Sequence, residues 1–217
     1  MTSDDRYDED YYMRGIETGK SLYSGYTWRP DLTVPMVERM IDYLGICKSQ
    51  TILDFGCARG YVVRAFRQLG YYAHGADVSE WAIRNADEEA KPYLTLAQNS
   101  ICGPPLENQE FDWVIAKDVL EHVYFVSHVV SALMRSARCG VFAVVPLSAF
   151  DNGEYVIADY EKDVTHTQRW TLPTWAAMFL RPGWRVEASY RVPGIKDNWH
   201  KEGWEKGNGF IIARRIK

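Results

Sequence analysis

Short apolar runs alternate with segments of helical spacing through the middle of the chain, and this alternation restricts the fold more than any other feature. Runs rich in β-branched and aromatic residues lie at 51–55, 71–76, 93–97, 111–116 and 141–145, and amphipathic segments lie between them at 61–69, 81–90 and 118–137. Strands that alternate with helices are joined by crossover connections, which make the strands parallel. The sequence therefore predicts an α/β protein with a doubly wound, mostly parallel sheet and helices on both faces.

The flanking segments extend this architecture. Helical spacing begins at Leu32 and stops at Gly45, and two late apolar runs near 184–192 and 210–215 bring the expected sheet to seven strands, the last antiparallel. A chain of 217 residues fits one domain. We expect that domain, 1–217, to consist of an N-terminal arm and helix (1–45), a core (50–146), a lid or substrate loop (147–170) and a C-terminal helix with strands (171–217).

Composition excludes several classes of protein. The formal net charge of −4 argues against a nucleic-acid-binding protein, because phosphate binding requires a basic excess. The acidic N-terminus carries no apolar run, and no window reaches the roughly 20 apolar residues of a membrane span. Four scattered cysteines without a C-x-x-C pair suit reduced thiols. We expect a soluble, cytoplasmic protein, monomeric or homodimeric, without nucleic-acid or membrane partners.

The turn after the first predicted strand carries the clearest ligand signal. Gly56 and Gly60 allow the backbone to turn tightly and approach a ligand, and the helix that follows points its free N–H groups toward it. A dinucleotide would require G-x-G-x-x-G, but counted from Gly56 the second glycine position holds Ala58 and the third holds Tyr61. The dinucleotide fingerprint therefore fails twice.

The run Leu53-Asp54-Phe55-Gly56-Cys57-Ala58-Arg59-Gly60 instead resembles the first motif of the class I, Rossmann-like S-adenosylmethionine-dependent methyltransferases. Two later stretches are similar to the second and fourth motifs of that family: Gly75-Ala76-Asp77-Val78-Ser79, and Phe111–Ile115 followed by Asp118–Val123. The resemblance spans about residues 50–146 and implies S-adenosylmethionine as cofactor. It assigns cofactor binding to Asp54, Gly56, Cys57, Ala58, Gly60, Asp77, Val78, Asn99, Ser100, Lys117 and Asp118.

Two of these carboxylates suit their roles on physical grounds. Asp77 follows the glycine turn by about twenty residues, the usual interval for an acid that accepts hydrogen bonds from ribose hydroxyls. Asp54 would add negative charge near a sulfonium. Their ordinary alternatives are a strand-end cap for Asp54 and a helix N-cap for Asp77. Ala58 departs from the middle glycine common in the family, and Asn99 stands near the place of an aspartate that often faces the adenine amine.

The segment after the fourth predicted strand offers candidate catalytic residues. Asp118, Glu121 and His122 would share one face of a helix, where they could bind a divalent ion or position His122 as a base. A similar acid-x-x-Glu-His element occurs in ubiquinone-pathway O-methyltransferases, which use it for a metal. Asp118 as N-cap with Glu121 three residues later also makes a capping box, and we prefer that interpretation and assign no metal.

The predicted lid carries a second candidate. His166, in Asp163-Val164-Thr165-His166, is the histidine we select as general base, because its ordinary pKa lies near neutrality. The resemblance includes this segment, which small-molecule methyltransferases carry after the fifth strand. The alternative is that His166 only anchors the lid by hydrogen bonds. Many aromatic residues at both ends of the chain suit either a cover over the acceptor or ordinary packing.

We therefore predict methyl transfer to a small-molecule acceptor, on an oxygen, nitrogen or carbon atom that the sequence does not identify. Two alternatives stay open. The first is a nucleic-acid methyltransferase, although the Asn or Asp-Pro-Pro run of base-amine enzymes is replaced here by Lys117-Asp118-Val119. The second is a protein that binds S-adenosylmethionine without catalysis, because a fold does not imply activity.

Overall fold

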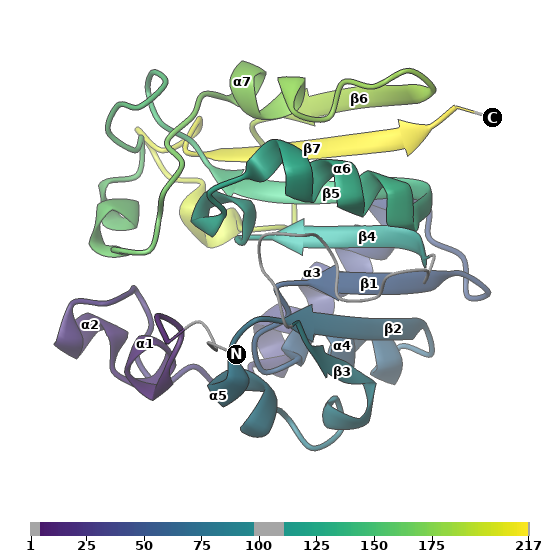
Figure 1. The fold of residues 1–217 in the computed structure, drawn as a ribbon, viewed down its shortest axis with the longest axis horizontal. Coiled ribbons are helices and arrows are strands. Elements are labelled where there is room, and N and C mark those ends of the chain that lie inside the picture. Colours follow the sequence, from purple (N-terminus) through teal and green to yellow (C-terminus); the bar gives the residue numbers. More distant parts are fainter. Residues whose placement is uncertain (1–4, 98–110, 217) are drawn as a thin grey trace.

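The computed structural model describes residues 5–97 and 111–216, and Figure 1 shows a single mixed sheet at their centre. Its seven strands run in the order β3-β2-β1-β4-β5-β7-β6. Every neighbouring pair is parallel except those that involve β7, which is antiparallel to both β5 and β6. The predicted fold class, a doubly wound sheet with one antiparallel last strand, is confirmed.

The strand bounds follow the predicted apolar runs closely. The strands are β1 Thr51–Phe55, β2 Tyr72–Asp77, β3 Leu94–Leu96, β4 Phe111–Lys117, β5 Ala137–Pro146, β6 Trp184–Ser189 and β7 Asn208–Arg215. In β5 all but two residues are buried, because the strand is covered on both faces and paired on both edges. The central strands are thus fixed by burial, and their carboxyl ends meet along one edge of the sheet.

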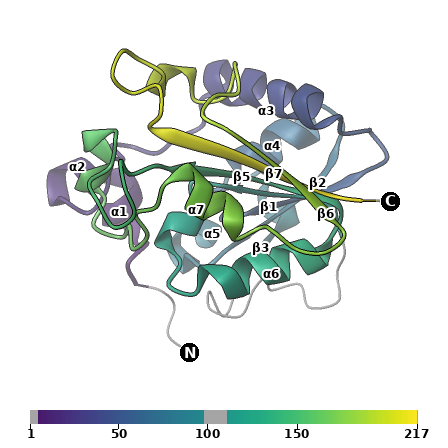
Figure 2. The same ribbon diagram turned by 90° about the horizontal axis from the view of Figure 1, so that it is seen from above.

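Helices cover both faces of the sheet (Figure 2). The α-helices are α1 Glu9–Met13, α2 Gly15–Thr18, α3 Pro30–Leu44, α4 Tyr61–Gln68, α5 Glu80–Arg84, α6 Val126–Ser136 and α7 Leu172–Ala177. Side chains from α3 and α4 form one apolar layer, and those from α6 and α7 form the other. Gly45 ends α3 as predicted, with a φ of 70°. Within the described residues no helix is long and apolar enough to cross a membrane.

The predicted helix over 118–137 is wrong in its first half. Asp118 has a φ of 55°, in the left-handed region, so the chain turns sharply as it leaves β4. A single 3-10 turn, η2 (Leu120–His122), follows, and α6 begins only at Val126. The capping box is also wrong, since the side chain of Asp118 binds lysines and the residue before α6 is Phe125, which has no side-chain cap. Asp118, Glu121 and His122 are therefore presented by a loop.

Two irregular segments lie over the edge where the parallel strands end. The arm that carries α1 and α2 is drawn in purple in Figure 1, and the loop after β5 lies beside it in green. That loop contains one short helix, η3 (Ala158–Lys162), and otherwise turns. The two are joined directly, because the Val164 N–H donates to the carbonyl of Lys20. They enclose the carboxyl ends of β1, β2 and β4 from the solvent side.

Candidate functional site

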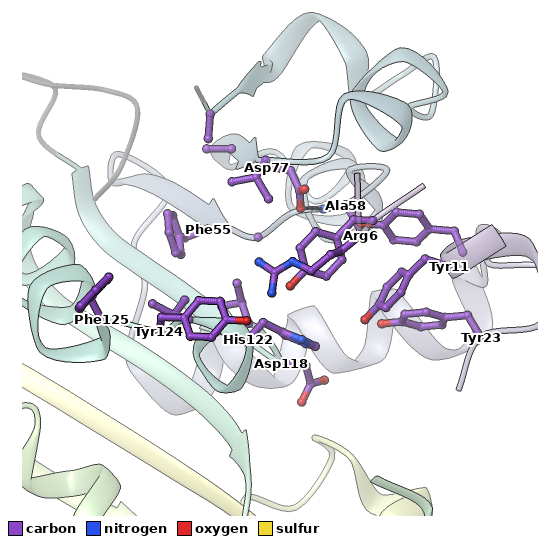
Figure 3. A pocket seen from close by; sticks show the side chains of 18 residues that line it. Arg6, Tyr11, Tyr23, Phe55, Ala58, Asp77, Asp118, His122, Tyr124 and Phe125 are labelled. Atoms are coloured by element: carbon purple, nitrogen blue, oxygen red, sulfur yellow. Dashed lines mark hydrogen bonds between the residues drawn. The ribbon is translucent and has the colours of Figure 1, made fainter. Parts of the chain in front are cut away.

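A cleft lies at the carboxyl ends of β1, β2 and β4, where ligands bind in sheets of this topology. We call it the strand-end cleft (Figure 3). Its floor comes from the sheet edge and its roof from the arm. The lining residues are Arg6, Tyr7, Tyr11, Tyr12, Tyr23, Phe55, Gly56, Ala58, Ala76, Asp77, Val78, Ala97, Asp118, Val119, His122, Val123, Tyr124 and Phe125.

The glycine turn forms one wall of this cleft by close backbone approach. Gly56 and Gly60 have φ values of 79° and 82°. A Cβ on Gly56 would lie 2.5 Å from Cγ2 of Val119, so the position has space only for hydrogen. Ala58, at φ 47°, takes the left-handed conformation despite its side chain, and its N–H donates to Asp77 Oδ2 at 2.7 Å. That bond to a carboxylate offsets the backbone cost of alanine at this position.

Asp77 ends β2 and lines the strand-end cleft with its buried carboxylate. Its Oδ2 accepts from Ala58, and its Oδ1 accepts from the N–H of Ser79 at 2.8 Å. A carboxylate has about four acceptor positions, and both of these bonds come from backbone N–H groups. The N-cap of α5 is Ser79, not Asp77. The ordinary N-cap alternative for Asp77 is thereby removed.

Asp54 sits one residue before the end of β1 and is also buried. Burial raises its pKa to about 7, against the opposing charge of Lys117. Neither Asp54 nor the buried Cys57 lines a cavity, whereas Val78 lines the strand-end cleft. The expectations for Asn99 and Ser100 lie outside the described residues.

A second cavity of about 560 Å³, which we call the loop cavity, opens beside the first. The two cavities share Tyr11, Tyr23, Asp118 and His122. Its volume falls within the roughly 300–1,000 Å³ of small-ligand sites. The lining residues are Tyr11, Leu22, Tyr23, Tyr26, Asp31, Leu32, Pro35, Met36, Lys117, Asp118, Glu121, His122, Tyr160, Asp163, Gly194, Lys196, Asp197, Asn198 and Trp199.

Asp118 lies between two lysines at the junction of these cavities. The ammonium of Lys117 is 2.5 Å from its Oδ2, and that of Lys196 is 2.6 Å from its Oδ1. Burial alone would raise the pKa of Asp118, but the two ammonium groups lower it below its usual range. The side chain of Lys196 is almost fully buried and is occupied by this ion pair. Asp118 therefore joins the end of β4 to the 194–199 segment through its two ion pairs.

Glu121, His122 and His166 form a cluster whose candidate ligand atoms all lie within 4.8 Å of one another. Glu121 Oε2 and His166 Nδ1 are buried without a hydrogen-bond partner. Burial and the negative charge of Asp118 raise the pKa of Glu121. Burial lowers the pKa of His122, and burial together with the adjacent His122 lowers that of His166 to about 4. Both imidazoles are therefore neutral at neutral pH.

The two histidines differ in their access to the cavities. His122 lines both, whereas His166 lines neither and packs against His122 with ring centroids 4.7 Å apart. Behind them, Asp163 accepts hydrogen bonds from Tyr11 and Thr165. Asp118 and His122 thus line the same two cavities, although a loop and not the predicted helix presents them, and His166 packs against His122 away from both cavities.

Sequence reasoning did not assign several lining residues to the site. Arg6 and Tyr7 enter the strand-end cleft from the arm, and the ring of Tyr7 meets that of His122 edge-on at 5.8 Å. Tyr160 and Trp199, which stack at 5.2 Å, line the loop cavity. The dense aromatic residues were the available signal, but their spacing does not distinguish a cavity wall from packing.

Comparison with known proteins agrees with this geometry. Residues 53–145 match the model of a methyltransferase domain. A ubiquinone biosynthesis O-methyltransferase from Methylococcus capsulatus is 35% identical over 92 residues, which cover 41% of this chain and 39% of that protein. The chain thus aligns with about two fifths of the length of this relative.

Solved structures of methyltransferases share the fold of the whole domain. A SAM-dependent methyltransferase from Archaeoglobus fulgidus superimposes with a TM-score of 0.64 at 18% identity, covering 86% of this chain and 95% of that one. Magnesium protoporphyrin IX methyltransferase from Synechocystis PCC 6803, with bound SAH, gives 0.58 at 16% identity, covering 85% and 83%. At these identities the likeness shows the fold alone.

Proposed function

We propose that this chain transfers a methyl group from S-adenosylmethionine to a small molecule held in the loop cavity. The observation that carries the proposal is the meeting of two cavities at Asp118 and His122. One is built around the glycine turn and Asp77, and the other is large enough for a small acceptor. A donor and an acceptor bound on the two sides would be held adjacent, which is the main requirement of this reaction.

The cofactor would lie along the strand-end cleft. Asp77 would accept hydrogen bonds from its ribose hydroxyls, and the backbone of Gly56 through Gly60 would border its methionine part. The cleft has a free volume of about 100 Å³, less than ordinary ligand pockets, and the arm residues Arg6 and Tyr7 line it. Cofactor entry therefore requires displacement of the arm.

His122 is the proposed general base. The acceptor atom attacks the methyl carbon with its lone pair, the carbon–sulfur bond breaks, and S-adenosylhomocysteine leaves. If the acceptor atom carries a proton, that proton passes to His122, which is neutral and lines both cavities. The role expected for His166 from the sequence thereby moves to its neighbour, because His166 lines neither cavity.

The buried atoms without hydrogen-bond partners beside His122 support a divalent cation as a second ligand of the site. Two imidazoles and a carboxylate are a donor set that suits Zn²⁺ or Mn²⁺, and unpartnered Glu121 Oε2 and His166 Nδ1 fit such a group. Glu121, His122 and His166 would hold the ion, while Asp118 stays with its lysines. A bound cation lowers the pKa of a coordinated hydroxyl. Calorimetry with Mn²⁺ on the wild type and on Glu121→Gln tests this; equal binding would contradict it.

Methyl transfer is tested with cofactor that carries an isotopically labelled methyl group. We expect label to enter the low-molecular-weight fraction of a cell extract, and His122→Gln to reduce the rate by about 10²-fold or more. His128→Gln, on the exposed side of α6, is the matched control and retains the rate. Label found only in nucleic acid would contradict the small-molecule acceptor. Cofactor binding without any transfer would contradict catalysis.

A further inference from the structure

A chain of buried polar groups lies behind His122 and connects the arm with the loop after β5. The Tyr11 hydroxyl donates to Asp163 Oδ2 at 2.8 Å. Thr165 donates twice to Asp163 Oδ1, from its N–H at 2.9 Å and from its hydroxyl at 2.6 Å. The Thr165 oxygen also lies 2.8 Å from Nδ1 of His122. Asp163 and Thr165 are almost fully buried, and Asp163 and Tyr11 also border the loop cavity.

The position of each hydrogen follows from the donors available. A threonine hydroxyl has one hydrogen, and a carboxylate can only accept. The Thr165 hydrogen therefore points to Asp163, and the Thr165 oxygen faces His122 with a lone pair. The contact with His122 is a hydrogen bond only if Nδ1 carries the imidazole hydrogen. The opposite tautomer would set two lone pairs against each other inside the protein, which costs the full desolvation of both groups.

We propose that Asp163 and Thr165 are positioning residues that hold His122 in the Nδ1–H tautomer, so that the Nε2 lone pair is available to a proton or a cation at the cavities. The inference rests on the proposed role of His122. It is independent of which of the two, proton or cation, Nε2 receives. The hydroxyl of Tyr11 donates to the other oxygen of Asp163, so the arm contacts the same carboxylate.

The tautomer has a direct consequence for function. An imidazole in the opposite tautomer presents an N–H to the cavity and can neither take a proton from an acceptor nor bind a metal ion through that nitrogen. Fixing the hydrogen on Nδ1 thus keeps the reactive nitrogen free before any ligand enters. Asp163 sets the direction of both hydrogen bonds, because its carboxylate can only accept and so the Thr165 hydroxyl must donate to it and accept from His122.

Nitrogen-15 NMR of protein labelled at histidine reads the tautomer without any substrate. The His122 signals are assigned by their loss in His122→Gln. We expect Nδ1 to show the shift of a protonated nitrogen and Nε2 that of an unprotonated one, the reverse of the preference of free neutral imidazole. The opposite pattern in the wild type would overturn the proposal, whatever the activity of the protein.

Variants then test which residues set the tautomer. Thr165→Val keeps the shape but removes the hydroxyl, so His122 should revert to the Nε2–H form, with kcat lowered about 10- to 100-fold and the KM for the cofactor unchanged. Thr165→Ser should restore the wild-type signals. Thr167→Val is the matched control, because that hydroxyl donates to the Glu121 carbonyl and does not touch the ring. We call the hydrogen bonds from His122 through Thr165 to Asp163 the relay, and an unchanged His122 tautomer in Thr165→Val would overturn it.

The same data separate this inference from the proposed function. If Thr165→Val switches the tautomer but leaves kcat unaltered, the relay stands and the role of His122 in methyl transfer is wrong. If the wild type shows the Nε2–H form while His122→Gln abolishes transfer, the relay is wrong, and His122 acts in transfer in another way than by accepting a proton or a cation at Nε2. In both cases the spectrum of the wild type decides on the relay.

Discussion

Substitution of Gly56 by alanine tests whether close backbone approach shapes the cleft. Gly56 has a φ of 79°, where an alanine costs about 1–2 kcal/mol. Its new Cβ would also lie 2.5 Å from Cγ2 and 2.8 Å from Cβ of Val119. Valine is stiff at χ1, so the clash cannot be relieved by a rotamer change and adds about 1–3 kcal/mol. We expect Gly56→Ala to destabilise the protein by about 2–5 kcal/mol.

Gly183 provides a matched control with the same backbone conformation. Its φ is also 79°, and nothing lies within 4 Å of an added Cβ, so Gly183→Ala should show the backbone cost alone. Urea unfolding of both variants gives the difference, about 1–3 kcal/mol, or roughly 3–9 °C in Tm for a chain of this size. Val119→Ala in the Gly56→Ala background removes the contact at 2.5 Å but keeps the one at 2.8 Å with Cβ, so it should recover only part of that difference. Equal destabilisation of the two glycine variants would refute the argument from close approach.

Three further changes probe the charges of the site. Asp77→Asn places an amide nitrogen against one of two backbone donors, so it should destabilise the protein by about 1.5–3 kcal/mol and weaken cofactor binding about tenfold or more in calorimetry. The control Asp112→Asn, at the opposite end of the sheet, should lower stability alone, and equal cofactor affinity in both variants would contradict the ribose role. Because burial raises the pKa of Asp54 to about 7, the folded protein keeps a proton there that the unfolded chain releases near pH 4. The free energy of unfolding in urea should therefore fall as the pH rises from about 4 to 7, and an equal slope in Asp54→Asn would contradict this. Lys196→Met should raise the lowered pKa of Asp118, and the stability that the lowered pKa gives is present above about pH 4 and lost as the pH falls. The difference in urea stability between wild type and variant should therefore narrow in acid, and a difference independent of pH would refute the ion pair.

The arm should change its dynamics when the cofactor binds. Residues lining the cleft, such as Tyr7 and Tyr11, lie on α1 or close to it, and the cleft is too small for the cofactor as it stands. Hydrogen exchange over residues 5–26 should therefore differ between the free and the cofactor-bound protein, while α3 stays unchanged. Identical exchange of the arm in both states would contradict displacement on binding.

The sequence by itself determined the sheet and the turn. The period of the apolar runs separates strands from helices locally, and parallel strands must be buried on both faces, so the order of elements indicated the fold. The turn from Gly56 to Gly60 is equally local, because positive φ values and close approach select glycine directly. Asp77 was selected from its interval of about twenty residues after the turn, and the structure places it at the end of β2 in the strand-end cleft.

Only the tertiary structure decided the chemistry beside the strand-end cleft. Asp118 and Glu121 have the spacing of a capping box, but the carboxylate of Asp118 pairs with Lys196, which is 78 positions away, and its backbone takes a positive φ instead of starting a helix. The choice between His122 and His166 likewise depends on which ring faces a cavity. Spacing along the chain determines contacts within one turn or one strand, whereas ion pairs and hydrogen bonds between distant loops exist only once the chain has folded.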